Sequence, residues 1–550
     1  MRNRRAVAIA LFALCMIAPR QVAAQHHEHT GKAPEKLGTV QFATSCNAQA
    51  QPRFNRGVAL LHSFWFKAAI EEFRGALAKD VHCAMAHWAI ALSLWGNPFA
   101  PKPYHSEATV REAWSAVQRA GELKPPTERE ADYVAAIAEL WRDAASRDAR
   151  TRLNAYAEAM ERVSTKHAED REARIFYAVA LAASAAPTDK TYAKQLKAGG
   201  LLEGIFGEMP DHPGVAHYII HSYDVPALAH RGLDAASKYA KIAPASAHAL
   251  HMPSHTFTRV GHWQESIDTN EASARAAKRD GCTAEELHAM DYQAYAYMQT
   301  GQEQAMKRTL AALPAVVKRL DPKELCGAAP GSAGLFAAAA IPARYALERG
   351  AWEEATSLAV RTSDFAYADA PTHFARALGF ARTKKLAEAR QEIGRLEALR
   401  DRLTTEKDLY WAGQVEIQRQ GAAAWVAYAE GRAEEAIALM RKAADAEDAT
   451  EKAAVTPGPL APARELLGEM LLESGNAREA LTAFETTLKK EPNRFRALYG
   501  AGRAAEAAGE RAKAAGYYRE LVTVTARGNA ARPELQHARK FVEGAKRAGA

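Results

Sequence analysis

One stretch of sequence decides the fold: LGEMLLESGNAREALTAFETTLKKEP, residues 467–492, whose pattern returns 34 residues later as AGRAAEAAGERAKAAGYYRELVTVTA, residues 501–526. Two glycines, an alanine and an aromatic residue keep their places, since Gly468, Gly475, Ala480 and Phe484 correspond to Gly502, Gly509, Ala514 and Tyr518. Small residues let two antiparallel helices approach closely, and the aromatic ring fills the space toward the next pair. Pro492 ends the second helix, because proline cannot continue one. The pattern predicts a series of helical hairpins.

A period of 34 residues is that of the tetratricopeptide repeat, which the C-terminal region resembles. Near the other end of the chain, Gly57, Ala69 and Phe73 keep the spacing of the first glycine, the alanine and the phenylalanine of that unit. The array therefore begins by about residue 52. The chain is rich in Ala, Leu, Glu, Arg and Lys and lacks a convincing strand pattern. We expect an all-α fold, a tetratricopeptide-type α-solenoid of antiparallel helical hairpins.

The sequence suggests five segments. They are a signal peptide (1–24), a mobile tail (25–45), an N-terminal tetratricopeptide-like array with a histidine cluster (46–312), a seam (313–334) and a C-terminal array with a capping helix (335–550). The seam holds three prolines and three glycines in 22 residues, so helical periodicity is expected to stop there.

The first 24 residues read as an export signal. Three arginines lie within the first five residues, an apolar run covers Ala6–Ala18, and Val22-Ala23-Ala24 offers small residues for cleavage after Ala24. The apolar run is too short to span a bilayer, so we expect a periplasmic or secreted protein without integral membrane association. Removal of four arginines reduces the net charge from +7 to +3. A net charge this small gives no reason to expect nucleic acid as a partner.

Four cysteines remain after signal removal: Cys46, Cys83, Cys282 and Cys326. Because none are spaced as CxxC, a thiolate zinc site is not expected. In an oxidising compartment an even number suggests two disulfides, and the simplest of three connectivities pairs Cys46 with Cys83 and Cys282 with Cys326. The alternative is four reduced, buried thiols.

Two histidine pairs recur at the repeat period, since His217 and His221 are followed 34 residues later by His251 and His255. Two imidazoles at i and i+4 can reach one ion, and adjacent helices lie about 8–10 Å apart. We therefore predict a four-nitrogen metal site for zinc or copper formed by His217, His221, His251 and His255, with His248, Asp224 and Met252 as reserve ligands. Pro253 should make the helix kink or restart near Met252.

The alternative is that these imidazoles hydrogen-bond one another and nearby acids in the concave groove. In the C-terminal array the equivalent places hold Glu465, Glu469, Tyr499 and Arg503, so the fold does not itself require histidine there. His62 is expected to be a core or groove histidine rather than a ligand. HExxH, GxSxG, Walker and Rossmann motifs are missing from the sequence, so no catalytic residue is assigned.

The runs His221-Ser222-Tyr223-Asp224 and His248 to His255 resemble a block found in bacterial exported tetratricopeptide-repeat proteins. The resemblance covers roughly residues 46–300, implies helical hairpins and brings no established reaction. Two functions fit the sequence. One is an exported scaffold that binds a peptide, a protein or a small ligand in its concave groove beside a histidine-lined metal site. The other is a zinc- or copper-dependent enzyme that uses the imidazole cluster.

Overall fold

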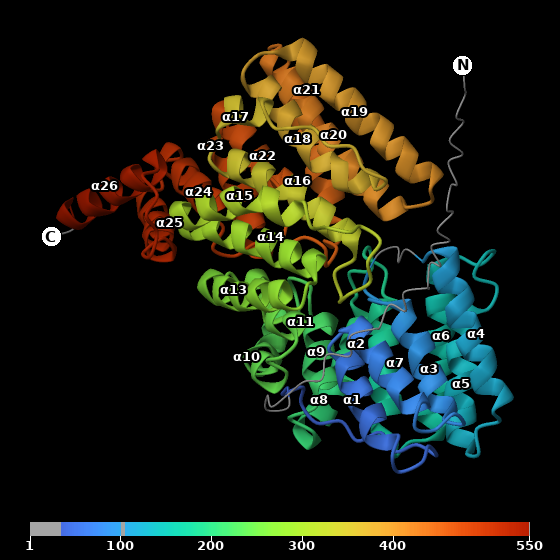
Figure 1. The fold of residues 1–550 in the computed structure, drawn as a ribbon. Helices are drawn as coiled ribbons and strands as arrows, with labels where there is room; N and C mark the ends of the chain where they lie inside the picture. Colours follow the sequence, from blue (N-terminus) through green and yellow to red (C-terminus); the bar gives the residue numbers. More distant parts are fainter. Residues whose placement is uncertain (1–34, 101–104, 549–550) are drawn as a thin grey trace, which may run out of the picture. The chain divides into compact units, whose positions relative to one another are not determined.

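All regular secondary structure of the described chain is helical (Figure 1). The structure is a computed structural model that describes residues 35–100 and 105–548. The prediction of an all-α tetratricopeptide-type solenoid is confirmed. The signal peptide and residues 25–34 lie outside the described residues, and by their contacts the residues from Lys36 onward form one unit.

The first half of the chain contains the helices α1 Gln51–His62, α2 Phe66–Leu77, α3 Ala84–Trp95, α4 Glu107–Glu122, α5 Glu128–Trp141, α6 Ala149–Lys166, α7 Arg171–Ala183, α8 Ala193–Glu208, α9 Pro213–Ser222, the 3-10 turn η1 Ala229–Gly232, α10 Leu233–Ile242, α11 Ala247–His251, α12 Pro253–Arg259 and α13 Trp263–Arg279. The second half contains α14 Thr283–Thr300, α15 Glu303–Val317, α16 Gly331–Glu348, α17 Trp352–Thr356, α18 Ala366–Arg382, α19 Leu386–Thr405, α20 Leu409–Ala429, α21 Ala433–Asp448, α22 Ala463–Glu473, α23 Ala477–Lys490, α24 Phe495–Ala507, α25 Arg511–Val524 and α26 Pro533–Ala548.

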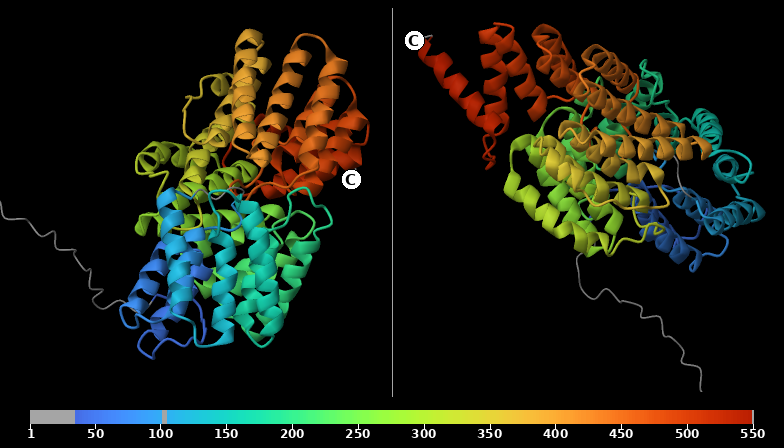
Figure 2. Two further views of the ribbon diagram at one scale, coloured as in Figure 1. Left: turned by 90° about the vertical axis from the view of Figure 1, so that its right-hand side faces the viewer. Right: turned by 90° about the horizontal axis from the view of Figure 1, so that it is seen from above.

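Consecutive helices pack side by side, as both views of Figure 2 show. Gly468 and Gly500 lie against the ring of Phe484, where an added Cβ would come within 2.9 Å and 2.4 Å of ring atoms. Gly57 lies against Phe73 in the same way, with a Cβ position 2.5 Å from the ring. Gly57 and Gly468 are therefore required by the close approach of the aromatic side chain, whereas Gly475 and Gly509 have no such neighbour and adopt a positive φ of 81°.

Residues 36–45, predicted as part of a mobile tail, are packed into the core instead. Phe42 is 1% exposed and contacts the rings of Phe54, Trp88 and Tyr133, with centroid separations of 5.6, 5.7 and 5.3 Å. The segment lacks helical periodicity because it is an extended strap whose apolar side chains enter the core of α1, α3 and α5.

The predicted seam, residues 313–334, does not divide the described chain into two arrays. Helix α15 continues past the exposed Pro314 to Val317, and α16 begins at Gly331. Helices α14 and α16 pack together, and Arg344 of α16 pairs with Asp291 of α14 at 2.8 Å, both fully buried. The proline and glycine cluster therefore forms a loop between α15 and α16, and both helices belong to the same packed array.

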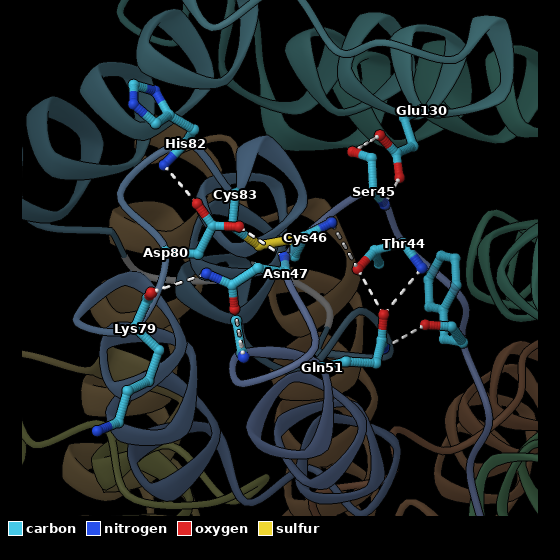
Figure 3. Close-up of a disulfide and its surroundings, with 12 residues drawn as sticks. Thr44, Ser45, Cys46, Asn47, Gln51, Lys79, Asp80, His82, Cys83 and Glu130 are labelled. Atoms are coloured by element: carbon cyan, nitrogen blue, oxygen red, sulfur yellow. Dashed lines mark hydrogen bonds between the residues drawn. A yellow bond between two sulfur atoms is a disulfide. The ribbon is translucent and has the colours of Figure 1, made fainter.

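Both predicted cysteine pairs lie at disulfide separation. The Cα atoms of Cys46 and Cys83 are 4.8 Å apart, and those of Cys282 and Cys326 are 5.6 Å apart. Beside the first pair, the backbone N–H of Asn47 donates to Asp80 at 2.7 Å (Figure 3). None of the described helices is long and apolar enough to cross a membrane.

Candidate metal centre

Four helices supply six buried histidines that gather in one place. Helix α9 begins at Pro213, and the N-cap residue His212 accepts a hydrogen bond from the backbone N–H of Val215. Helix α11 ends at His251, and α12 restarts with Pro253 in its first turn, which confirms the predicted interruption. Because proline in the first turn costs no hydrogen bond, the break turns the chain between two histidines without strain.

The first set contains His217 and His221 of α9 and His248 of α11. One ring nitrogen of each residue lies within 4.8 Å of those of the other two. The Nε2 atoms of His217 and His248 are 3.0 Å apart. His217 Nδ1 donates to the backbone carbonyl of His62 at 2.6 Å, which leaves its Nε2 unprotonated and directed at the set.

The second set contains His251 of α11, His255 of α12 and His288 of α14, again with one nitrogen each within 4.8 Å. His221 and His255 bring the two sets together, since their ring centroids are 6.0 Å apart. His248 and His251 do the same at 6.1 Å. The two sets therefore form one continuous centre.

The predicted single site of four histidines stays a prediction, and by the distances between their nitrogens the structure groups these residues differently. His217 and His221 belong to one set, whereas His251 and His255 belong to the other. The rings within each pair are closer, with centroids 4.8 Å apart for His217 and His221 and 4.9 Å apart for His251 and His255, than the rings of His221 and His255, which are 6.0 Å apart. Each pair is completed by a histidine from a following helix, and for the first pair this is the reserve residue His248.

The second set contains a conflict that a cation would remove. Asn270 Nδ2 donates to the Ser266 carbonyl at 2.7 Å, which orients the amide so that Oδ1 accepts from His251 Nδ1 at 2.6 Å. His255 Nδ1 donates to Asp224 Oδ2 at 2.8 Å. Both Nδ1 atoms therefore carry the proton, and the two Nε2 atoms present lone pairs to each other at 3.0 Å. A proton or a metal ion between them makes this contact favourable.

A proton is disfavoured there because burial penalises the charged imidazole. Desolvation, and then the neighbouring imidazoles, hold the pKa of His217, His221 and His251 well below 6.5. The same causes lower the pKa of His288 to about 3. Desolvation lowers the pKa of His255 to about 4, although Asp224 opposes the change. These five rings are neutral at pH 7 and can bind a metal without first losing a proton.

Asp224 orients His255 and lies outside both sets, and its role as a reserve ligand stays a prediction. Arg259 Nε donates to Asp224 Oδ1 at 2.9 Å, and Lys452 Nζ lies 3.5 Å from Oδ2. Burial would raise the pKa of Asp224, but the charges of Lys452 and Arg259 outweigh it and hold this pKa well below 3.8. An ionised carboxylate behind a ligating imidazole is a common second layer of metal sites.

Three ring nitrogens of the centre have no hydrogen-bond partner among the described residues. They are His221 Nε2, His248 Nδ1 and His288 Nδ1, all buried. Glu285 Oε2 faces His248 Nδ1 at 3.9 Å and is also without a hydrogen-bond partner. Other buried polar atoms of the described chain, such as Trp88 Nε1 and the Tyr156 hydroxyl, also lack a partner, so these nitrogens support a bound ion because they lie together.

A nearby histidine cluster shows the contrasting, structural case. His62 Nε2 and His212 Nε2 each lie 2.9 Å from one oxygen of Glu172. Their Nδ1 atoms are used by the Tyr218 hydroxyl at 3.0 Å and the Val215 N–H at 3.3 Å. Every ring nitrogen of this cluster is hydrogen-bonded, as expected for the core histidine predicted at His62.

The histidines are buried rather than exposed in a groove, so that part of the prediction is wrong. His251 and His217 are 0% exposed. Two loops far apart in the sequence cover the centre, with Ala328 and Pro330 from one and Ala454 and Val455 from the other.

Sequence reasoning missed His288. It follows His251 by 37 residues, three more than the repeat period, and Tyr292 occupies the i+4 position of a third pair. The Tyr292 hydroxyl lies 3.3 Å from His255 Nε2. A search for HxxxH and HxxxY pairs with variable spacing would have found it.

A small cavity lies between the two sets and has a volume of about 20 Å³. Two histidines of each set line it, namely His221, His248, His255 and His288. A larger cavity of about 210 Å³ adjoins it, and both are lined by Phe99, His221 and Ala454. The rings of Phe99 and His221 are stacked with centroids 3.9 Å apart. The centre is therefore buried yet next to space that a small molecule can enter.

Residues 466–532 match the tetratricopeptide repeat family. The TPR domain of P58(IPK) is a similar solved structure, with 11% identity, coverage of 90% of this chain and 99% of that chain, and a TM-score of 0.21. The human IFIT1 dimer with PPP-AAAA shares 12% identity over 80% of this chain and 91% of its own, with a TM-score of 0.38. No curated protein matches the chain. The family match covers residues 466–532, and the described chain as a whole has the all-α fold of a tetratricopeptide-type solenoid.

Proposed function

We propose that this protein binds two metal ions next to each other, one in each three-histidine set, within a tetratricopeptide scaffold. The facing Nε2 atoms of His251 and His255 carry the proposal, because hydrogen bonds fix both Nδ1 protons and burial disfavours a third proton. Three imidazoles per ion suit zinc or copper, with one position open for a further ligand.

Native mass spectrometry of the untagged protein, stripped with a chelator and titrated with Cu or Zn, tests this proposal. We expect two ions per folded chain beyond any bound by the N-terminal tail, whose His26, His27 and His29 precede the described residues. Variants His221→Ala and His288→Ala should each bind one ion fewer. His262→Ala removes an exposed imidazole outside both sets and serves as the control. Equal metal content in all four proteins would reject the centre.

We also propose export, with the signal peptide cleaved after Ala24 and two disulfides formed outside the cytoplasm. The separations of the two cysteine pairs support this, because both fall within the range for a disulfide. Mass spectrometry with a thiol-alkylating reagent should find no free thiol in the exported protein. Four alkylated cysteines would contradict the proposal.

A second function is supported by a cavity of about 440 Å³ in the C-terminal region. Arginines, glutamates and aromatic residues line it, and Arg382, Arg496 and Arg532 pair with Glu473, Glu469 and Glu534 of the same lining. We propose that it binds a peptide segment of a partner protein, since arginine and aromatic side chains such as Arg503, Trp352 and Tyr499 are enriched at binding hot spots. Arg503→Ala should weaken capture of a partner peptide while leaving the metal content unchanged.

A further inference from the structure

We infer that the metal is copper and that the cavity between the two sets binds dioxygen across a pair of copper ions. This inference rests on the proposed metal centre and adds the identity of the metal and of the small ligand. It follows from the charge of the donors, the position of the cavity and the space that leads to it.

The donor set favours ions of low charge. Both sets consist of imidazoles, which bind a metal ion as uncharged ligands. The charged groups around them largely cancel, because Asp224 pairs with Arg259 and lies near Lys452, and Glu285 faces His248. Two divalent ions would bring four positive charges into this buried site, whereas two cuprous ions bring two. Since each buried charge costs several kcal/mol, cuprous copper fits better than zinc, and imidazole is a ligand that copper accepts well.

The cavity lies where a bridging ligand would have to lie. It is lined by His221 and His248 from one set and by His255 and His288 from the other. A cavity needs roughly 10–15 Å³ to hold one water molecule. About 20 Å³ therefore has room for a molecule as small as dioxygen.

Two larger cavities border this one and share lining residues with it. The adjoining cavity of about 210 Å³ shares Phe99 and Ala454 with it, and another of about 540 Å³ shares Asn97 and Ala328. Ala328 is 3% exposed and lines both the small cavity and the larger one. A larger side chain at this position should narrow the route without removing a ligand.

The two cuprous ions supply all the electrons that dioxygen accepts. Each cuprous ion gives one electron, dioxygen accepts two, and the product is a peroxide dianion held between two cupric ions. No bond of the protein is formed or broken, and no proton is required. Release of dioxygen reverses the transfer, whereas protonation of the bound peroxide by acid releases hydrogen peroxide.

The test uses the full-length protein, stripped of metal and loaded anaerobically with two equivalents of Cu(I). On exposure to dioxygen we expect uptake of one molecule per two copper ions, release of hydrogen peroxide on acidification, and little electron paramagnetic resonance signal because the two cupric ions are magnetically coupled. Variants His248→Ala and His288→Ala should each retain one copper and lose this uptake. Ala328→Val should keep both coppers and slow the uptake, and His262→Ala should behave as the native protein.

The outcomes separate this inference from the proposed metal centre. Two bound coppers without uptake of dioxygen, or with the full signal of two isolated cupric ions, would overturn the inference and leave the centre intact. Binding of zinc in preference to Cu(I) in direct competition would also overturn it. Failure to bind any metal at the histidines would reject both.

Discussion

Replacing His251 by alanine tests the burial of the centre and its metal binding together. His251 is 0% exposed, and its Nδ1 donates to Asn270 at 2.6 Å. Truncation of a large core side chain costs about 2–5 kcal/mol, and an unpaired buried acceptor costs about 1–3 kcal/mol. Loss of the lone-pair contact with His255 offsets part of this, so we expect the metal-free variant to be about 3 kcal/mol less stable.

Bound metal should add a second difference in stability between the native protein and the His251→Ala variant. At about 100-fold excess over Kd, an ion that binds only the folded state stabilises it by about 2.7 kcal/mol. The variant should lose the contribution of one ion and keep that of the other, which is measurable by urea denaturation with chelator or with metal. His262→Ala is the exposed control. If the His251→Ala variant loses less than about 1 kcal/mol of unfolding free energy in the presence of chelator, His251 behaves as an exposed groove residue. If metal stabilises the variant and the native protein equally, His251 is not a ligand.

Three further perturbations follow from the structure. The pKa of His255 is lowered to about 4, so as pH falls below 6.5 the unfolded chain takes up a proton before the folded one does. The free energy of unfolding of the metal-free protein should therefore fall between pH 6.5 and pH 4, by about 1.4 kcal/mol per pH unit for each such histidine. A free energy of unfolding that does not change over this range would contradict the burial of these histidines. Replacing Cys46 and Cys83 by serine should cost about 3–4 kcal/mol, because the bridge closes a loop of 37 residues, and an unchanged denaturation midpoint would argue against the bridge. Arg344→Met leaves Asp291 buried without its partner and should cost about 3–5 kcal/mol, unless the carboxyl is protonated, which denaturation at several pH values would reveal.

Local sequence patterns were sufficient for the fold. The repeated glycines and aromatic residues predict the hairpins for two local reasons. Gly468 and Gly502 lie against the rings of Phe484 and Tyr518, and Gly475 and Gly509 adopt a positive φ of 81° between the helices. The strap at residues 36–45 could not be predicted, because Phe42 is held by side chains from α1, α3 and α5 rather than by its sequence neighbours.

The histidine centre was predicted only in part, for a physical reason. The i and i+4 spacing fixes which imidazoles share a helix face, and it identified two pairs. The grouping depends on how neighbouring helices pack, which places His248 beside His217 and His288 beside His251. Burial depends on two covering loops that carry Ala328 and Ala454 and come from distant parts of the sequence.

Anomalous X-ray diffraction from crystals of the metal-loaded protein tests the central claim most directly. We predict two separate peaks at the absorption edge of the bound metal. One should lie at about 2.0–2.1 Å from nitrogens of His217, His221 and His248, and the other at the same distance from nitrogens of His251, His255 and His288. A single peak shared by His217, His221, His251 and His255, or no peak within this cluster, would contradict the account of two adjacent metal ions.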